Sequence, residues 1–185
     1  MNIKKKENLL RIDKFCRICK SKRIEEVLKL KDSPFEDQFL SKSQIKTKQL
    51  SYPLEVYLCK DCSYVFLPHI LSPETSYKYY LYNTEVTLGL NRHYDEHAKK
   101  IAEKYKLAKN SFCVDIGSND GSLLRSFQSI GFQVLGIEPA KFIASRANKN
   151  NLKTINSFFN DKVVNEIILK YNKPQIITAN YVFAN

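Results

Sequence analysis

The sequence has no apolar run of about 18 residues, so we predict no transmembrane helix. The basic N-terminus contains no apolar stretch followed by a small-residue cleavage site. We therefore interpret residues 1–13 as a flexible basic tail rather than a signal peptide, and we expect a cytoplasmic protein. An Arg-rich stripe and an RNA-binding signature are also absent, although the net charge is +11. Because the lysines are spread along the chain, we interpret most of them as solvated; a phosphate-bearing substrate would also benefit from the positive field.

The five cysteines do not suggest a disulfide framework, because no secretion signal accompanies them. Four of them form two C-x2-C pairs, in which both sulfurs of a tight turn can face one ion. Two such knuckles complete a tetrahedral thiolate site, which zinc prefers in structural sites. We predict a structural zinc site; the alternatives are two unrelated pairs or a redox C-x-x-C motif. The predicted ligands are Cys16, Cys19, Cys59 and Cys62.

Two further residues have simpler interpretations. His69 is close in sequence to the second cysteine pair, but four cysteines already suffice for the metal. The fifth cysteine, Cys113, is expected to be a small core residue on a strand.

The second half of the chain alternates short apolar runs with helical patterns, which predicts an α/β domain with a parallel sheet. Asn160 is a good N-cap for the last helix. We expect strands over residues 111–116, 132–137, 151–155 and 174–179, and helices over 122–130, 139–149 and 161–171.

The loop after the first of these strands has the composition of a ligand-binding turn. Gly117 and Gly121 allow a tight turn and close approach of a ligand, and Asn119 tolerates a left-handed conformation. Asp115 can accept a hydrogen bond from a ligand ammonium group. Glu138 follows the second strand, where an acid binds ribose hydroxyls.

The loop lacks the G-x-G-x-x-G pattern of dinucleotide sites and instead reads D-x-G-x-x-x-G. An acid two residues before the first glycine suits an amino-acid moiety better than a pyrophosphate, which favours S-adenosylmethionine over NAD. The alternative is a structural turn that binds nothing. In a doubly wound sheet the ligand lies over the carboxyl ends of the strands. The residues expected there are Asp115, Glu138, Asn156 and Asn180.

The sequence resembles the S-adenosylmethionine-dependent C-methyltransferases with an N-terminal zinc-binding domain, many of which act on nucleotide-linked deoxysugars. The matching stretches are CRIC…CKDC, YKYYLYNTEVTLGLNRHYDEHA, VDIGSNDGSLL, VLGIEP and ITANYVFA. The resemblance implies a cofactor site made of Asp115, Gly117, Ser118, Asn119, Gly121, Glu138, Pro139 and Asn180.

The resemblance also implies a catalytic candidate. Tyr82 matches a tyrosine of a motif that reaches the active site, and we assign it to proton handling at the methyl-accepting carbon; the alternative is a packing residue. His93 matches a motif histidine, for which a hydrogen-bonded structural role is expected. Asn185 stands where the family often has histidine, and the rest of the family's catalytic set lies further downstream.

Together these features predict an α/β protein with a small zinc-ribbon-like β domain and an incomplete Rossmann-like class I methyltransferase domain, containing four of about seven strands. The expected fourth strand should pair with the first and leave an exposed edge open to another chain. The alternatives are an RNA-directed methyltransferase with a zinc ribbon, or a non-catalytic fragment that needs a partner chain. The expected boundaries are a tail at 1–13, a zinc domain at 14–70, a Tyr-rich helical linker at 71–110 and a cofactor domain at 111–185.

Overall fold

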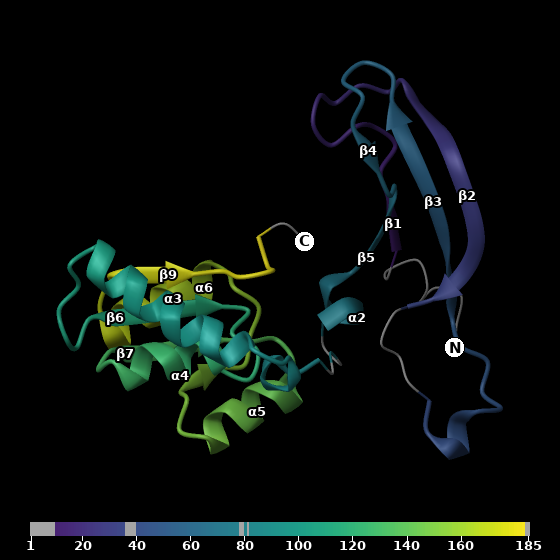
Figure 1. The fold of residues 1–185 in the computed structure, drawn as a ribbon. Coiled ribbons are helices and arrows are strands. Elements are labelled where there is room, and N and C mark those ends of the chain that lie inside the picture. The colour runs from purple at the N-terminus through teal and green to yellow at the C-terminus, as the bar shows by residue number, and fades with distance from the viewer. Residues whose placement is uncertain (1–9, 36–39, 78–79, 81, 184–185) are drawn as a thin grey trace. The chain divides into compact units, whose positions relative to one another are not determined.

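The computed structural model describes residues 10–35, 40–77, 80 and 82–183 and divides the chain into two compact units (Figure 1). The first unit ends at Ser76 and the second begins at Tyr77. Most of the expected basic tail (residues 1–9) and Asn185 lie outside the described residues.

The first unit is built from antiparallel strands. β1 (Leu10–Ile12) pairs with β5 (His69–Leu71), and a three-stranded sheet has the order β2-β3-β4. Its strands are β2 (Ile24–Pro34), β3 (Ser51–Cys59) and β4 (Val65–Phe66); the short helices are η1 (Lys42–Gln44) and α2 (Pro73–Tyr77). The second cysteine pair thus lies at the turn between β3 and β4.

The first unit has few hydrophobic side chains to bury. β2 pairs with β3 from Ile24↔Cys59 to Pro34↔Ser51, yet β2 exposes nearly every side chain. The buried hydrophobic side chains described in this unit are Cys16, Tyr52, Cys59 and Phe66. Because two of these four are knuckle cysteines, cross-linking by a metal is expected to supply much of the folding free energy.

The second unit is a parallel sheet covered by helices. Its strand order is β8-β7-β6-β9, so the fourth strand pairs with the first, as predicted. This order places the reversal of winding between β6 and β9. The strands are β6 (Phe112–Ile116), β7 (Gln133–Ile137), β8 (Thr154–Ile155) and β9 (Ile176–Thr178). The helices are η2 (Thr84–Val86), α3 (Leu90–Lys104), α4 (Ser122–Ser129), α5 (Lys141–Lys149) and α6 (Asp161–Tyr171).

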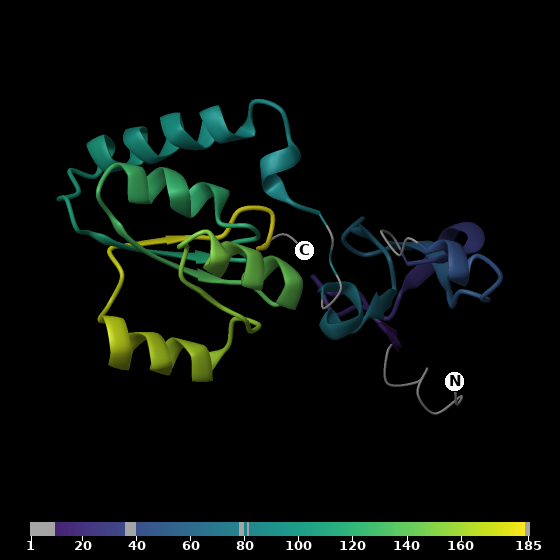
Figure 2. The same ribbon diagram turned by 90° about the horizontal axis from the view of Figure 1, so that it is seen from below.

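Alternation along β6 builds a separate core on each face of this sheet. Cys113 packs in a cluster with Tyr94 and Ala98 of α3 and with Leu124 and Phe127 of α4. On the opposite face, β6 and β7 pack against α6; this cluster contains Phe112, Val114, Leu135, Ile137, Val163 and Ile167. Figure 2 shows α3 and α4 on one side of the sheet and α6 on the other. By the same alternation, Asp115 belongs to the face that α3 covers.

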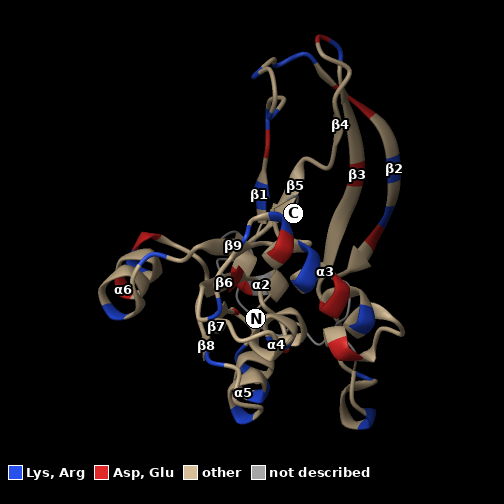
Figure 3. Ribbon diagram, turned by 60° about the vertical axis from the view of Figure 1, so that its left-hand side comes forward, with Lys and Arg blue, Asp and Glu red and all other residues tan. Residues whose placement is uncertain are grey.

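Basic and acidic side chains are interspersed along β2, α3 and α6 (Figure 3). This mixture agrees with the interpretation of the lysines as solvated residues. Among the described residues, no helix is both long enough and apolar enough to cross a membrane.

Candidate functional site

The two cysteine knuckles of the first unit have the same backbone geometry. The amide of Lys20 donates to the carbonyl of Cys16 at 3.0 Å, and the amide of Ser63 donates to that of Cys59 at 2.9 Å. Lys20 and Ser63 both have left-handed backbones, with φ of 63° and 59°. Each chain segment therefore turns sharply four residues after its first cysteine, and both cysteines of a pair face the same side.

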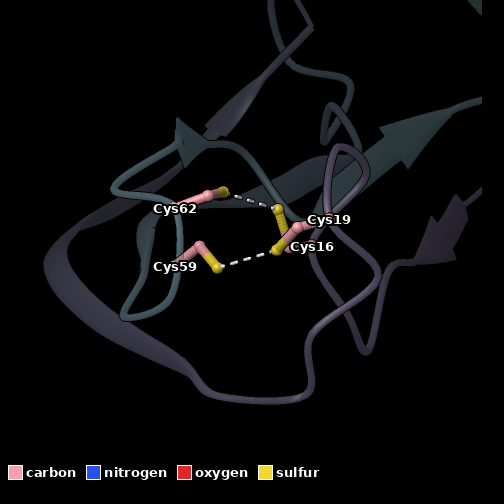
Figure 4. A group of neighbouring side chains, drawn as sticks. All are labelled: Cys16, Cys19, Cys59 and Cys62. Atoms are coloured by element: carbon pink, nitrogen blue, oxygen red, sulfur yellow. Dashed lines mark hydrogen bonds between the residues drawn. The ribbon is translucent and has the colours of Figure 1, made fainter.

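The knuckles bring the four thiols together (Figure 4). The Sγ atoms of Cys16 and Cys62 lie 3.6 Å apart, those of Cys19 and Cys59 lie 3.5 Å apart, and all four lie within 4.8 Å of one another. Four sulfurs at about 2.3 Å from a tetrahedral zinc ion are about 3.8 Å from one another, so the cluster fits Zn²⁺. His69 is not part of this cluster. With four protein ligands, the site has no open position for a substrate.

The thiols differ in their proton affinity. Burial raises the pKa of Cys16, but the backbone N–H groups of Cys19 and Ile18 donate to its sulfur and bring the pKa down to about 7. The N–H group of Tyr64 lowers the pKa of Cys62, yet burial and the neighbouring thiols outweigh it and raise the pKa to about 12. A cation bound among the thiols would favour the thiolate form of the ligands.

Polar contacts also join the two knuckles. Arg23 forms an ion pair with Asp61 at 2.6 Å, and the Ser21 hydroxyl donates to the same carboxylate. The Lys60 amide donates to the carbonyl of Arg23 at 2.9 Å. These bonds place the second pair of cysteines opposite the first.

In the second unit, the loop between β6 and α4 passes close to its neighbours. Gly117 and Gly121 have φ of 67° and 81°. A Cβ on Gly117 would contact the side chain of Val182, and one on Gly121 would lie 2.6 Å from Cδ1 of Leu152. Asn119 is also left-handed, with φ of 50°. Both glycines are therefore required by conformation and by space.

Asp115 lies at the carboxyl end of β6 and is 4% exposed. Its Oδ1 accepts a hydrogen bond from the Thr178 hydroxyl of β9 at 2.6 Å. Burial raises the pKa of Asp115 to about 7, and the charge of Glu138 adds to this, although the bond from Thr178 opposes it. A buried carboxylate with one neutral partner is a strong site for a cation.

Glu138 directly follows β7 and is 5% exposed. Its Oε2 accepts from the amide of Asn119 at 3.0 Å and its Oε1 from the amide of Ala140 at 2.7 Å. Burial raises the pKa of Glu138. Because each carboxylate oxygen has a second lone pair, Glu138 can still accept hydrogen bonds from a ligand diol.

Other residues of the predicted cofactor set have mainly structural contacts. Within the described part of the chain the Ser118 hydroxyl has no hydrogen-bond partner; it is directed at β7, where a Cβ on Gly136 would lie 2.9 Å from the Ser118 Cβ. The Asn156 amide group donates to the carbonyls of Glu138 and Pro139, at 2.8 and 2.9 Å. Asn156 thereby supports the turn after β7. Asn180, two residues beyond β9, is exposed.

The tyrosine-rich segment lies beside this loop. We call residues 82–87 the strap. The side-chain amide of Asn119 donates to the carbonyl of Tyr82 at 2.9 Å, and its Oδ1 accepts from the amide of Thr84 at 3.0 Å. The Tyr82 side chain is 41% exposed, and its hydroxyl lies 2.5 Å from Oγ1 of Thr87. The side chain of Asn119 therefore binds the strap, whereas its backbone N–H binds Glu138.

Sequence reasoning missed Tyr94 of α3. Its side chain is 8% exposed; burial raises its pKa to about 12, with additional contributions from the charges of Asp115 and Asp120. Tyr94 is thus a neutral phenol close to the predicted site. The sequence feature that could have identified Tyr94 is its position on the apolar face of α3, directly after the exposed His93.

His93 and Cys113 can be compared with their expected roles. The His93 ring stacks on His97, with centroids 5.9 Å apart, and it forms no side-chain hydrogen bond within the described ranges. His93 is exposed on α3, and its expected hydrogen-bonded role stays a prediction. Cys113 is a fully buried core residue, as predicted, and burial raises its pKa to about 12.

Comparison with known proteins finds similarity over most of the chain. Residues 16–77 match a family described as "Putative zinc binding domain". Over 170 residues, 92% of this chain, the sequence is 25% identical to the C-methyltransferase NovU of Streptomyces niveus. The alignment covers 40% of that relative, so the chain spans less than half the length of the protein it matches.

A solved structure of the plantazolicin methyltransferase BpumL in complex with SAH is also similar, with 20% sequence identity and a TM-score of 0.35. The match covers 48% of this chain and 38% of that one, and it is too distant to carry an inference. Residues 16–77 thus match the zinc-binding domain model, and the chain is similar to a C-methyltransferase over nearly all of its length.

Proposed function

We propose that this chain binds S-adenosylmethionine at the carboxyl ends of β6 and β7 and forms the N-terminal part of a C-methyltransferase. One observation carries the proposal: Asp115 and Glu138 are buried carboxylates at the ends of adjacent parallel strands, with the left-handed glycine loop between them. The similarity to NovU supports the reaction class.

The residues present fit this cofactor. Asp115 would accept a hydrogen bond from the amino group, and Glu138 would accept from the ribose hydroxyls. Gly117 and Gly121 would let the ligand approach the backbone, and Tyr94 would supply a neutral phenol beside Asp115. When bound, the cofactor supplies an electrophilic methyl group on a sulfonium.

Calorimetry with S-adenosylhomocysteine on the 185-residue chain tests the cofactor site. Because an ammonium group prefers the ionised form of Asp115, whose pKa is about 7, the affinity at pH 6 should be about tenfold weaker than at pH 8. Asp115→Asn and Glu138→Gln should each weaken binding at pH 8, and Glu103→Gln, on the exposed face of α3, is the control. Absence of binding to the wild type, or tighter binding of NAD, would exclude the proposed cofactor.

We propose a nucleotide-linked deoxysugar as the methyl acceptor and Tyr82 as the residue that assists proton transfer at the accepting carbon. Methyl transfer to carbon requires removal of a proton by a group within hydrogen-bond reach. Tyr82 is half-exposed on the strap beside the glycine loop, which supports this role. In a protein extended to the length of the relative, Tyr82→Phe should lower kcat more than it changes cofactor affinity. Equal kcat values for variant and wild type would assign Tyr82 to packing.

Two alternatives predict different results. An RNA-directed methyltransferase would bind RNA with an affinity that falls steeply with salt, and the basic and acidic residues interspersed along β2, α3 and α6 disfavour this. A non-catalytic fragment would bind S-adenosylhomocysteine, yet it would transfer no methyl group from labelled S-adenosylmethionine until a partner chain is added.

We also propose a cytoplasmic location and strand pairing through β9. The five described cysteines are free thiols, and a four-thiolate zinc site is stable in a reducing compartment. Among the described strands β9 pairs with β6 alone, and its Ile177 is 61% exposed. A sedimentation coefficient that rises with protein concentration, and no longer does so in Ile177→Lys, would support pairing through this edge.

A further inference from the structure

Asp120, in the loop between β6 and α4, binds both α4 and the strap. Its side chain is fully buried, and its Oδ1 accepts from the amide and hydroxyl of Ser122, at 3.0 and 2.7 Å, at the start of α4. Its Oδ2 accepts from the amide of Glu85, in the strap, at 2.8 Å. One carboxylate therefore joins the helix after the glycine loop to a segment 35 residues earlier.

Asn119 forms the second half of this connection. Its amide group donates to the carbonyl of Tyr82, its Oδ1 accepts from the amide of Thr84, and its own backbone N–H donates to Glu138. Asn119 and Asp120 together, which we call the clip, hold three successive peptide groups of the strap. Outside the clip, Glu85 also pairs with Arg146 of α5.

We propose that Asn119 and Asp120 are positioning residues that couple the ligand at Glu138 to the strap bearing Tyr82. This inference rests on the proposed function. Occupation of Glu138 by a ligand fixes the backbone of Asn119; Asn119 and Asp120 in turn fix the strap. The strap is therefore held more firmly when the cofactor is present, which favours binding of the cofactor before the acceptor.

Asp120→Asn isolates the clip with little change in volume. The new side chain has one oxygen, which can cap Ser122 or hold the strap, but cannot do both. Glu85→Gln is the matched control, because it removes the ion pair to Arg146 and keeps the backbone N–H that Asp120 binds. Asn119→Asp is a second variant: it keeps the acceptor for Thr84 and puts an oxygen against the carbonyl of Tyr82.

Amide hydrogen exchange of the 185-residue chain, measured by NMR with and without saturating S-adenosylhomocysteine, provides the test. In the wild type, the amides of Thr84 and Glu85 should be protected, and the ligand should slow them further. In Asp120→Asn, the Glu85 amide should exchange about tenfold faster or more, and the ligand should no longer slow it. In Glu85→Gln, the amide of residue 85 should still exchange slowly without ligand and more slowly with it. If the protection depended on the ion pair to Arg146 instead of on Asp120, this variant would lose it.

The results separate the two proposals. Failure of S-adenosylhomocysteine to bind the wild type would refute the cofactor assignment, and ligand-dependent coupling with it. Normal ligand binding with the same Glu85 exchange rate in wild type and Asp120→Asn would refute the clip alone. If Asp120→Asn does not fold, Asn119→Asp decides the matter: ligand protection of the strap as large as in the wild type would overturn the coupling.

Discussion

Asp115 is predicted to make the second unit less stable as the pH rises. Its pKa is about 7 in the folded chain, against about 3.9 in an unfolded one. The folded state therefore holds this proton more tightly, and its stabilising effect is complete below about pH 4. The effect is lost between about pH 4 and 7, at about 1.4 kcal/mol per pH unit, and sums to about 4 kcal/mol.

The substitution Asp115→Asn should remove this dependence. An asparagine keeps an oxygen for the Thr178 hydroxyl and carries no charge. Its NH2 group adds a cost that does not change with pH, so the informative quantity is the difference in unfolding free energy between variant and wild type. That difference should rise by about 3 kcal/mol in favour of the variant from pH 5 to 8. The variant should gain this stability while losing cofactor affinity.

Urea unfolding followed by circular dichroism at 222 nm measures the effect, because the long helices α3 to α6 all lie in the second unit. Glu103→Gln, at an exposed position of α3, is the control and should run parallel to the wild type. If the unfolding free energy of Asp115→Asn changed with pH in the same way as that of the wild type from pH 5 to 8, burial would not raise the pKa of Asp115. That result would refute the electrostatic reasoning.

Two further predictions concern the metal and the glycine loop. Chelation of zinc, or Cys62→Ser, should lower the zinc content below one ion per chain and unfold the first unit while the 222 nm signal of the second persists; full retention of near-ultraviolet tyrosine signals after chelation would contradict this. Gly117→Ala should destabilise the second unit by about 2 kcal/mol more than Gly89→Ala, because both have φ near +70 to +80° but only Gly117 has Val182 in the space a Cβ would fill. Equal melting temperatures for the two variants would show that backbone conformation alone sets the cost.

The features that the sequence predicted are those with local causes. The Asn160 side chain caps α6 by accepting from the amide of Val163 at 3.1 Å, as its residue type indicates. The cysteine knuckles follow from two-residue spacing and a left-handed fourth position. The parallel sheet follows from alternating apolar runs and helical periodicity, and β6 beside β9 follows from winding in both directions.

The features that it did not predict depend on contacts between distant residues. Nothing near Asp120 indicates that its carboxylate binds the amide of Glu85, 35 residues away. Likewise, the space around Gly117 is limited by Val182, which follows a different strand. β2 was not predicted as an 11-residue strand. Apolar and polar residues alternate only from Leu28 to Lys31, which is too short to indicate a strand of this length, and the structure leaves most side chains of β2 exposed.

The separation of the cysteine pairs also sets the timing of folding during protein synthesis. Cys59 follows Cys19 by 40 residues, which the ribosome adds in about 2 to 8 s. For that interval the nascent chain offers an ion only the two thiols of the first knuckle, so metal can exchange with other cellular ligands. The first unit can close around its ion only once β3 has been synthesised to its final residue, Cys59, and Cys62 has followed it.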